Sequence, residues 1–183
     1  VHPTDRYHLA VITGGCPTGN EPSPTLNAID GESLDNILAA GDSGVLAHKD
    51  SKGWTRLCAP DLKISYASVF HLPGSQTFFV GSNFLGLLWF LDRNKPLAQV
   101  YQNLAISDAN QAYIQRISGD ASRIVAVGDR GTVLYFDLKS DPRTLPSPTG
   151  DTLYGVALSG DTLWVSGRKN RVWRAQLSEL AAQ

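Results

Sequence analysis

The sequence contains no methionine and only two cysteines, Cys16 and Cys58, among its 183 residues. Two cysteines suit either a single disulfide in an exported protein or a pair of buried thiols. Residues 1–6 do not resemble a signal peptide, so we expect any such segment to have been removed already. The low cysteine count therefore excludes a disulfide-rich scaffold but leaves the compartment open between these two alternatives.

Charge and long apolar runs are also scarce. Charged residues make up 18% of the chain, hydrophobic residues 42%, and the net charge is −1. This composition is typical of a globular domain and gives no electrostatic reason to expect nucleic acid as a partner. No apolar run approaches the roughly 20 residues that a transmembrane helix needs. A sustained helical period is missing too, and only residues 178–183 look locally helical.

Motifs that carry common chemistry are absent as well. The chain has no phosphate-binding loop and no nucleophile elbow, and the stretch Gly128–Gly131 is too short for a dinucleotide fingerprint. The histidines are scattered rather than spaced as metal ligands; they are His2, His8, His48 and His71. We therefore predict no catalytic residue, no cofactor and no metal site.

A repeat runs through the chain instead. Glycine closes a short apolar run at Gly41, Gly81, Gly128 and Gly167, with spacings of 40, 47 and 39 residues. Such a period is close to the ~40–50 residues of a four-stranded propeller blade. A second apolar stretch begins 14 or 15 residues before each glycine, and Gly- and Asp-containing turns join the two. A third strand follows each glycine, and three of these four strands end in aspartate.

The repeat predicts an all-β fold, a β-propeller of four blades with about four antiparallel strands each. We place a single domain over residues 1–183, with blades at about 26–60, 66–102, 113–147 and 153–176. The fourth repeat lacks an outer strand, and the β-prone segment 7–13 is unassigned. We expect this segment to complete the last blade and close the ring. A segment of a larger propeller remains the alternative.

Ring closure would also place the cysteines near each other. Cys58 falls in the outer strand of the first blade, and Cys16 follows the closing strand of the last blade. We predict a Cys16–Cys58 disulfide at this seam if the protein is exported.

Residues 26–31, 37–48 and 53–55, which return in degenerate form at 124–131, resemble the BNR or Asp-box type of bacterial propeller repeat. The resemblance includes the photosystem assembly-factor and myxobacterial lipoprotein branches and covers most of the chain. Only Asp50–Trp54 approaches a full Asp box. Sialidases share this repeat type, so the resemblance raises a glycosidase-like enzyme as a third possibility. It would require an arginine cluster such as Arg130, Arg168 and Arg171 beside a nucleophilic tyrosine.

The turns between second and third strands differ where the strands repeat. One carries an apolar pair, Phe84 and Leu85, and another concentrates positive charge between Arg168 and Arg171. Because loops on a rigid scaffold commonly carry binding, we predict that they form the surface for a protein partner. The predicted partner-binding residues are Asp42, Asn83, Phe84, Leu85, Arg130, Arg168, Lys169 and Arg171.

Four tryptophans bear on the alternative of a carbohydrate-binding lectin. Trp89, Trp164 and Trp173 lie within strand patterns and are expected in the core between blades, whereas Trp54 follows a turn. A lectin would show matching polar and aromatic residues in equivalent loops, and these loops do not match one another. The expected function is therefore a non-catalytic binding or scaffold module, exported and within a secreted or membrane-associated assembly, with an extracellular lectin as the alternative.

Overall fold

The computed structural model describes residues 25–58, 64–82, 88–92, 98–101, 113–140 and 142–182. In these ranges the chain forms four antiparallel sheets, three of four strands and one of three. Strands that are neighbours in the sequence are also neighbours in each sheet. The prediction of an all-β architecture built from repeated antiparallel sheets is confirmed.

Each sheet is a meander of short strands. The first contains β1 (Leu26–Ser33), β2 (Asn36–Gly41), β3 (Val45–Asp50) and β4 (Gly53–Cys58). The second contains β5 (Tyr66–His71), β6 (Thr77–Ser82), β7 (Leu88–Asp92) and β8 (Ala98–Tyr101). The third contains β9 (Ile114–Gly119), β10 (Ile124–Gly128), β11 (Val133–Phe136) and β12 (Arg143–Thr144). The last contains β13 (Leu153–Ser159), β14 (Thr162–Gly167) and β15 (Arg171–Gln176), and the short helix α1 (Leu177–Ala181) follows it.

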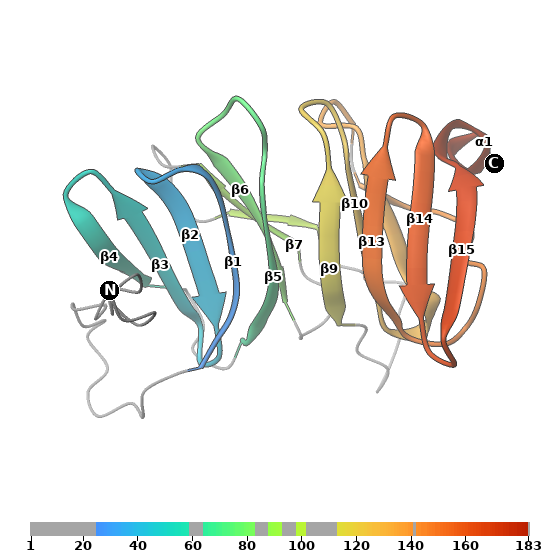
Figure 1. Cartoon of the computed structure of the whole chain (residues 1–183), viewed down its shortest axis with the longest axis horizontal. Coiled ribbons are helices and arrows are strands. Elements are labelled where there is room, and N and C mark those ends of the chain that lie inside the picture. The colour runs from blue at the N-terminus through green and yellow to red at the C-terminus, as the bar shows by residue number, and fades with distance from the viewer. Residues whose placement is uncertain are drawn as a thin grey trace, which may run out of the picture.

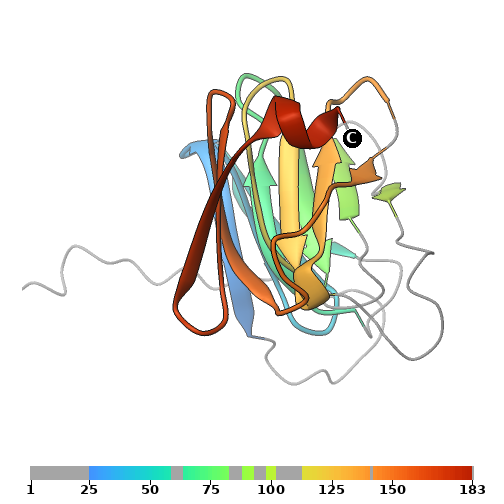
Figure 2. The same ribbon diagram turned by 90° about the vertical axis from the view of Figure 1, so that its right-hand side faces the viewer.

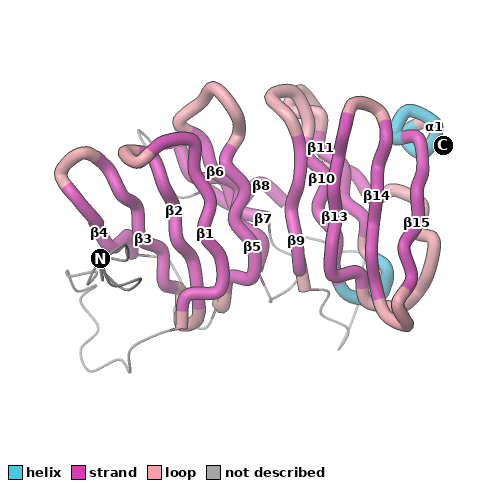
Figure 3. Tube along the Cα trace, viewed as in Figure 1, coloured by secondary structure: helices cyan, strands magenta, loops and turns pink. Residues whose placement is uncertain are grey.

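The four sheets stand side by side in a row (Figures 1 and 3). Strand β5 packs between β1 and β9, and β9 in turn contacts β13. The first and last sheets lie at opposite ends of the row, so the described strands do not return on themselves. The segment 7–13, which we expected to complete the last sheet, lies outside the described residues. Among the described strands, β15 pairs with β14 alone.

The strand register corrects the predicted repeat at one position. The first strand of each sheet begins opposite the end of the second, in the pairs Leu26–Gly41, Tyr66–Ser82, Ile114–Gly128 and Leu153–Gly167. Ser82, and not Gly81, is therefore the structural equivalent of the other three glycines. Gly81 is small for another reason, because a Cβ there would clash with the side chain of Ile114 in the next sheet.

Three apolar layers lie between the four sheets. The second strand of each inner sheet is central to this packing, since its side chains alternate between the preceding and the following sheet. Both of its faces are buried, which explains the unbroken apolar runs in the sequence. The three layers contain, among others, Leu38 and Ala40 against Phe78 and Val80; Phe79 against Ile124 and Ala126; and Val125 and Val127 against Leu163 and Val165.

The tryptophans divide differently from the prediction. Trp173 is half-buried and packs against the third apolar layer, and Trp54 is half-buried as well. Trp164, expected in the core, is 44% exposed. It points away from the third sheet because its neighbours Leu163 and Val165 point toward it. No described strand covers the side of the last sheet on which Trp164 lies, so this prediction was wrong.

Candidate functional site

In the first, third and last sheets, the turns between the second and third strands share a backbone anchor. The residue that follows the second strand donates its N–H to the carbonyl of the residue just before the first strand. These bonds join Asp42 to Thr25 at 2.9 Å, Asp129 to Tyr113 at 3.0 Å and Arg168 to Thr152 at 3.1 Å. At Gly41 and Gly128 a Cβ would clash with the same carbonyl groups, so this close approach requires glycine.

A side-chain hydrogen bond repeats at the same place. In the first sheet Asn27 Nδ2 donates to Asp42 Oδ1 at 2.8 Å, and in the third Gln115 Nε2 donates to Asp129 Oδ1 at 3.2 Å. In the last sheet donor and acceptor change places. The turn residue donates there, from Arg168 Nε to the Tyr154 hydroxyl at 3.3 Å. An arginine thus occupies the position that is an aspartate in the first and third sheets.

The turn of the last sheet is basic and exposed. Arg168, Lys169 and Arg171, named here the basic turn, are all exposed side chains. Lys169 and Asn170 adopt left-handed backbone angles, with φ of 62° and 56°. A left-handed pair of residues makes a tight two-residue turn, which holds the charged side chains close together at the end of the hairpin.

Neighbouring groups fix the charge state of the basic turn. Lys169 Nζ lies 3.0 Å from Asp151 Oδ2. This hydrogen bond, together with the charges of Lys169, Arg171 and Arg168, lowers the pKa of Asp151. The hydrogen bond to Tyr154 raises the pKa of Arg168. The turn therefore presents three cations against one carboxylate, an arrangement that can bind carboxylate or carbonyl groups of a partner.

The structure brings together only part of the predicted partner surface. The turns that hold Asp42, Arg130 and the basic turn lie on the same edge of the row, the lower edge in Figure 1. Asp42 belongs to the first sheet and the basic turn to the last, at opposite ends of the row. Arg130 is exposed, lies in the 3-10 turn η2 (Asp129–Gly131) and adopts a φ of 58°. Asn83, Phe84 and Leu85 lie outside the described residues.

Sequence reasoning missed the residues that support the turns. Asn27, Gln115 and Tyr154 each lie 14 or 15 residues before the turn residue that they contact. That constant offset was visible in the sequence as the distance between the first strand and the turn. The identity of the pairs was not visible, because Asn, Gln and Tyr have no common motif.

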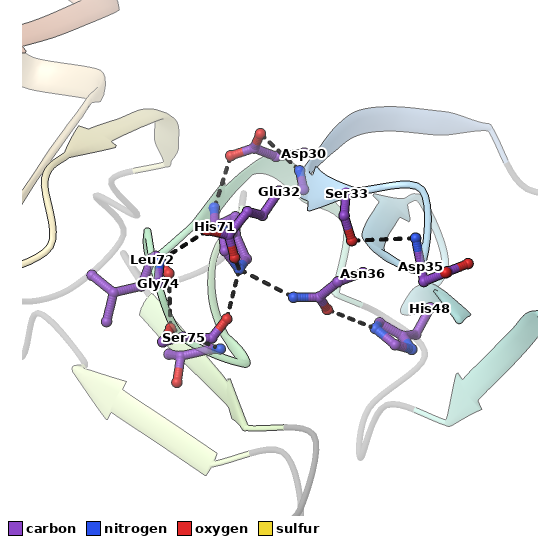
Figure 4. A network of polar contacts seen from close by, with 12 residues as sticks. Asp30, Glu32, Ser33, Asp35, Asn36, His48, His71, Leu72, Gly74 and Ser75 are labelled. Carbon is purple, nitrogen blue, oxygen red and sulfur yellow. Dashed lines mark hydrogen bonds and ion pairs between the residues drawn. The ribbon is translucent and has the colours of Figure 1, made fainter. Parts of the chain in front are cut away.

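A second polar feature lies between the first two sheets (Figure 4). Asn36 is buried and contacts two histidine rings, with His71 Nε2 at 3.2 Å from its Nδ2 and His48 Nε2 at 3.1 Å from its Oδ1. His71 also donates its backbone N–H to Asp30 Oδ2 at 2.7 Å. The network joins the sheets through satisfied polar groups, which is a structural role. In the part of the chain that the structure describes, no group of three or more His, Cys, Asp or Glu side chains could hold a metal ion.

An apolar cavity of about 200 Å³ lies where the third sheet meets the last. Its lining includes Pro146, Pro148, Trp173 and Leu180. The third apolar layer forms its floor, through Val133, Leu163 and Val165. Ser147 and Arg174 are the polar residues of its lining. Among the described helices, none has the length and apolar character that crossing a membrane requires.

No protein-family model and no curated protein matches the chain. Solved structures do match. The computationally designed protein Ika8 superimposes with a TM-score of 0.65 at 11% identity, over 83% of this chain and 46% of Ika8. Sqt1 of Saccharomyces cerevisiae, a WD40 β-propeller, superimposes with a TM-score of 0.65 at 17% identity, over 86% of this chain and 47% of Sqt1. The chain thus has a propeller-like fold and spans about half the length of these two structures.

Proposed function

We propose that this chain is a non-catalytic binding module that docks through its basic turn onto an acidic region of a protein partner. The observation that carries the proposal is the change of charge at Arg168. The equivalent hydrogen-bonded position is an aspartate in the first and third sheets. The backbone anchor is the same in all three turns, so folding does not demand the arginine. A charge change at a position that the fold leaves free is best explained by recognition.

The physical chemistry of the basic turn favours a carboxylate-bearing partner. Arg168 and Arg171 offer planar donors that can bind a carboxylate with two hydrogen bonds. Arginine is also enriched among the residues that dominate binding energy at protein interfaces. Asp42, Asn83, Phe84, Leu85 and Arg130 remain part of the proposed partner surface, and Asp42, at the opposite end of the row from the basic turn, would be contacted only by a partner that extends along this edge. An exported or membrane-associated location and the resemblance to BNR repeats are also part of this proposal.

The proposal can be tested with a probe of defined chemistry. A fluorescent hexaglutamate peptide should bind the wild-type chain, and its affinity should fall with added salt because exposed charges are screened. The double variant Arg168→Glu/Arg171→Glu should lose this binding at least tenfold. The matched control is Arg143→Glu, which reverses an exposed arginine on β12. Equal binding by the control and the double variant, or by a hexalysine peptide, would contradict the proposal.

Carbohydrate binding is a second candidate function, and the observation that favours it is Trp164. Its indole is partly exposed, and the Arg174 guanidinium lies 5.9 Å from the ring centroid. Exposed indoles bind the apolar faces of sugars, and the adjacent guanidinium could donate hydrogen bonds to hydroxyl groups. Quenching or enhancement of tryptophan fluorescence by an oligosaccharide panel, lost in Trp164→Ala, would establish this function. An unchanged spectrum would exclude it for the sugars used.

A further inference from the structure

In the part of the chain that the structure describes, three sheets have a fourth strand and the last sheet has none. Strands β4, β8 and β12 pair with the third strands of their sheets, whereas β15, the third strand of the last sheet, pairs with β14 alone. Figure 2 looks along the row from the end formed by this last sheet. The outer edge of β15 is therefore a place where an extended chain can add a strand.

The repeat shows which backbone groups of β15 point to this edge. Val172 on β15 is equivalent to Val133 on β11, since each pairs with the residue just before the glycine that ends the second strand. In the third sheet the Val133 carbonyl accepts the N–H of Leu145, the residue after β12, at 2.8 Å. The Val172 carbonyl is therefore directed to the open edge. Because this direction alternates along an antiparallel strand, the backbone groups of Arg174 are directed there as well.

Trp173 shows that the packing is incomplete at this edge. Its side chain packs against the third apolar layer, yet it is only half-buried. The equivalent residue of the third sheet, Leu134, pairs with Thr144 of β12 and is 1% exposed. Both side chains face the preceding sheet, so a fourth strand is the element that distinguishes their surroundings.

The apolar cavity between the third and last sheets lies along the same edge. Its wall includes Trp173, Arg174 and Ala175, which are three consecutive residues of β15. Consecutive residues of a strand point to opposite faces, so a wall that contains all three follows the edge of the strand. Pro146 and Pro148, which follow β12, also line the cavity. A strand added to β15 therefore has a space of about 200 Å³ for the side chains that it turns toward the third sheet.

The charge of the edge defines the chemistry of the added strand. Arg174 is exposed, and the basic turn leads directly into β15, with Arg171 as the first residue of the strand. Between Leu153 and Gln176 the last sheet carries one acidic and four basic side chains, a net charge of +3. An acidic strand is therefore attracted to this edge. Segment 7–13 of this chain, which the sequence predicted for this place, contains no acidic side chain and does not complement the charge.

We infer that an extended segment of the acidic partner adds to β15 as the fourth strand of the last sheet. It runs antiparallel to β15, as β4, β8 and β12 run to their third strands. Residues opposite Val172 and Arg174 form the backbone hydrogen bonds and carry acidic side chains. The residues between them are apolar and enter the cavity beside Trp173. The choice of an acidic partner rests on the proposed function, and the inference adds the conformation and the sequence pattern of that partner.

A fluorescent peptide in which glutamate and valine alternate tests this inference by fluorescence anisotropy. It should bind the wild-type chain at least tenfold more tightly than the same peptide with serine in place of valine, because serine does not fill an apolar cavity. Methylation of the glutamate N–H groups removes the donors that face β15 and should weaken binding roughly tenfold. Methylation of the valine N–H groups, which point away from β15, should leave binding nearly unchanged.

A pair of variants of the chain tests the same contact from the other side. Arg174→Pro removes an N–H that is directed to the open edge and away from β14, a position at which an edge strand tolerates proline. The matched control Arg174→Ala loses the same side chain and keeps the N–H. Arg174→Pro should bind the glutamate–valine peptide at least tenfold more weakly than Arg174→Ala, and circular dichroism should show both folded. Hexaglutamate, which needs only the charge of the basic turn, should bind the two variants equally.

Four results would overturn the inference. They are no binding of the glutamate–valine peptide by the wild-type chain, equal binding of the valine and serine peptides, and equal binding of the two methylated peptides. The fourth is tighter binding of a labelled peptide of residues 7–13, which would assign the edge to this chain's own segment. Failure of the proposed function is distinguishable, because Arg168→Glu/Arg171→Glu would then leave hexaglutamate binding unchanged. Continued discrimination between the valine and serine peptides would in that case still support strand addition.

Discussion

The junction between the second and third sheets and the outer face of the last sheet use the same repeat position in opposite ways. Phe79 points from β6 into the third sheet and is buried beside Ile124 and Ala126. Trp164 points from β14 away from the third sheet and remains partly in solvent. Burial at this position therefore depends on the presence of a following sheet, since both residues are large aromatics at the same register. Four predictions test this dependence.

Truncation of the buried aromatic should reduce stability the most. Phe79→Ala should lower the free energy of unfolding by about 3–5 kcal/mol, because it leaves a cavity in the second apolar layer. Trp164→Ala should lower it by less than about 1 kcal/mol in the isolated chain. Urea unfolding followed by circular dichroism measures both changes. Equal losses for the two variants would contradict the comparison.

The second effect concerns a position where a sheet tolerates no side chain. Gly128→Ala should destabilise the chain by about 1–3 kcal/mol, because the new Cβ would clash with the Tyr113 carbonyl and displace the turn. Gly150→Ala is the control, since no heavy atom beyond its two neighbours in the chain lies within 4 Å of its added Cβ. Thermal unfolding of the two variants should show a clear drop in melting temperature for Gly128→Ala only.

A third, smaller loss of stability is expected from two serines, whose hydroxyl groups accept hydrogen bonds from the next sheet. One lies between the second and third sheets and the other between the third and last. Ser68 Oγ is buried and accepts the Ile117 N–H of the next sheet at 3.0 Å. Ser68→Ala should cost about 1–2 kcal/mol, because a buried donor loses its acceptor. Ser118 Oγ accepts the Leu158 N–H at 3.3 Å in a part-buried setting, so Ser118→Ala should cost less. Chemical denaturation of both variants decides the order.

The smallest effect is electrostatic and confined to a turn. Asp137 accepts hydrogen bonds from the N–H groups of Lys139 and Ser140 and from the Ser140 hydroxyl, and these bonds lower its pKa. Its folded-state pKa lies below its unfolded value, so the stabilisation is present above the unfolded pKa. It is lost as the pH falls through the folded pKa. The stability difference between wild type and Asp137→Asn, measured by chemical denaturation at several pH values, should therefore shrink on acidification.

Much of the fold could be predicted because its signals are local. A period of about 40 residues, Gly- and Asp-containing turns and short apolar runs predict antiparallel hairpins wherever they occur. Asp50 illustrates the locality, since its carboxylate accepts the Lys52 N–H and shapes the turn that the sequence indicated. The register was less predictable. At Gly81 the glycine serves the neighbouring sheet, and a small residue placed for packing reads like one placed for a turn.

The candidate site was predictable only in its charge. Arg168, Lys169 and Arg171 stand out in the sequence because they are close together between two strands. Their partners Tyr154 and Asp151 lie at least 14 residues away and become neighbours only through the pairing of β13 with β14. Asp42, grouped with them from the sequence, is separated from them by the length of the row.

Local signals in the sequence were enough to predict the strands, their turns and their division into four similar sheets, because hydrophobic alternation and turn chemistry act over a few residues. Which faces of those sheets are covered depends on packing between distant parts of the chain. Ile29 and Val69 are similar apolar residues at equivalent positions, yet one is exposed and the other buried. Burial requires a neighbouring surface, and the identity of that neighbour depends on contacts between residues far apart in the chain.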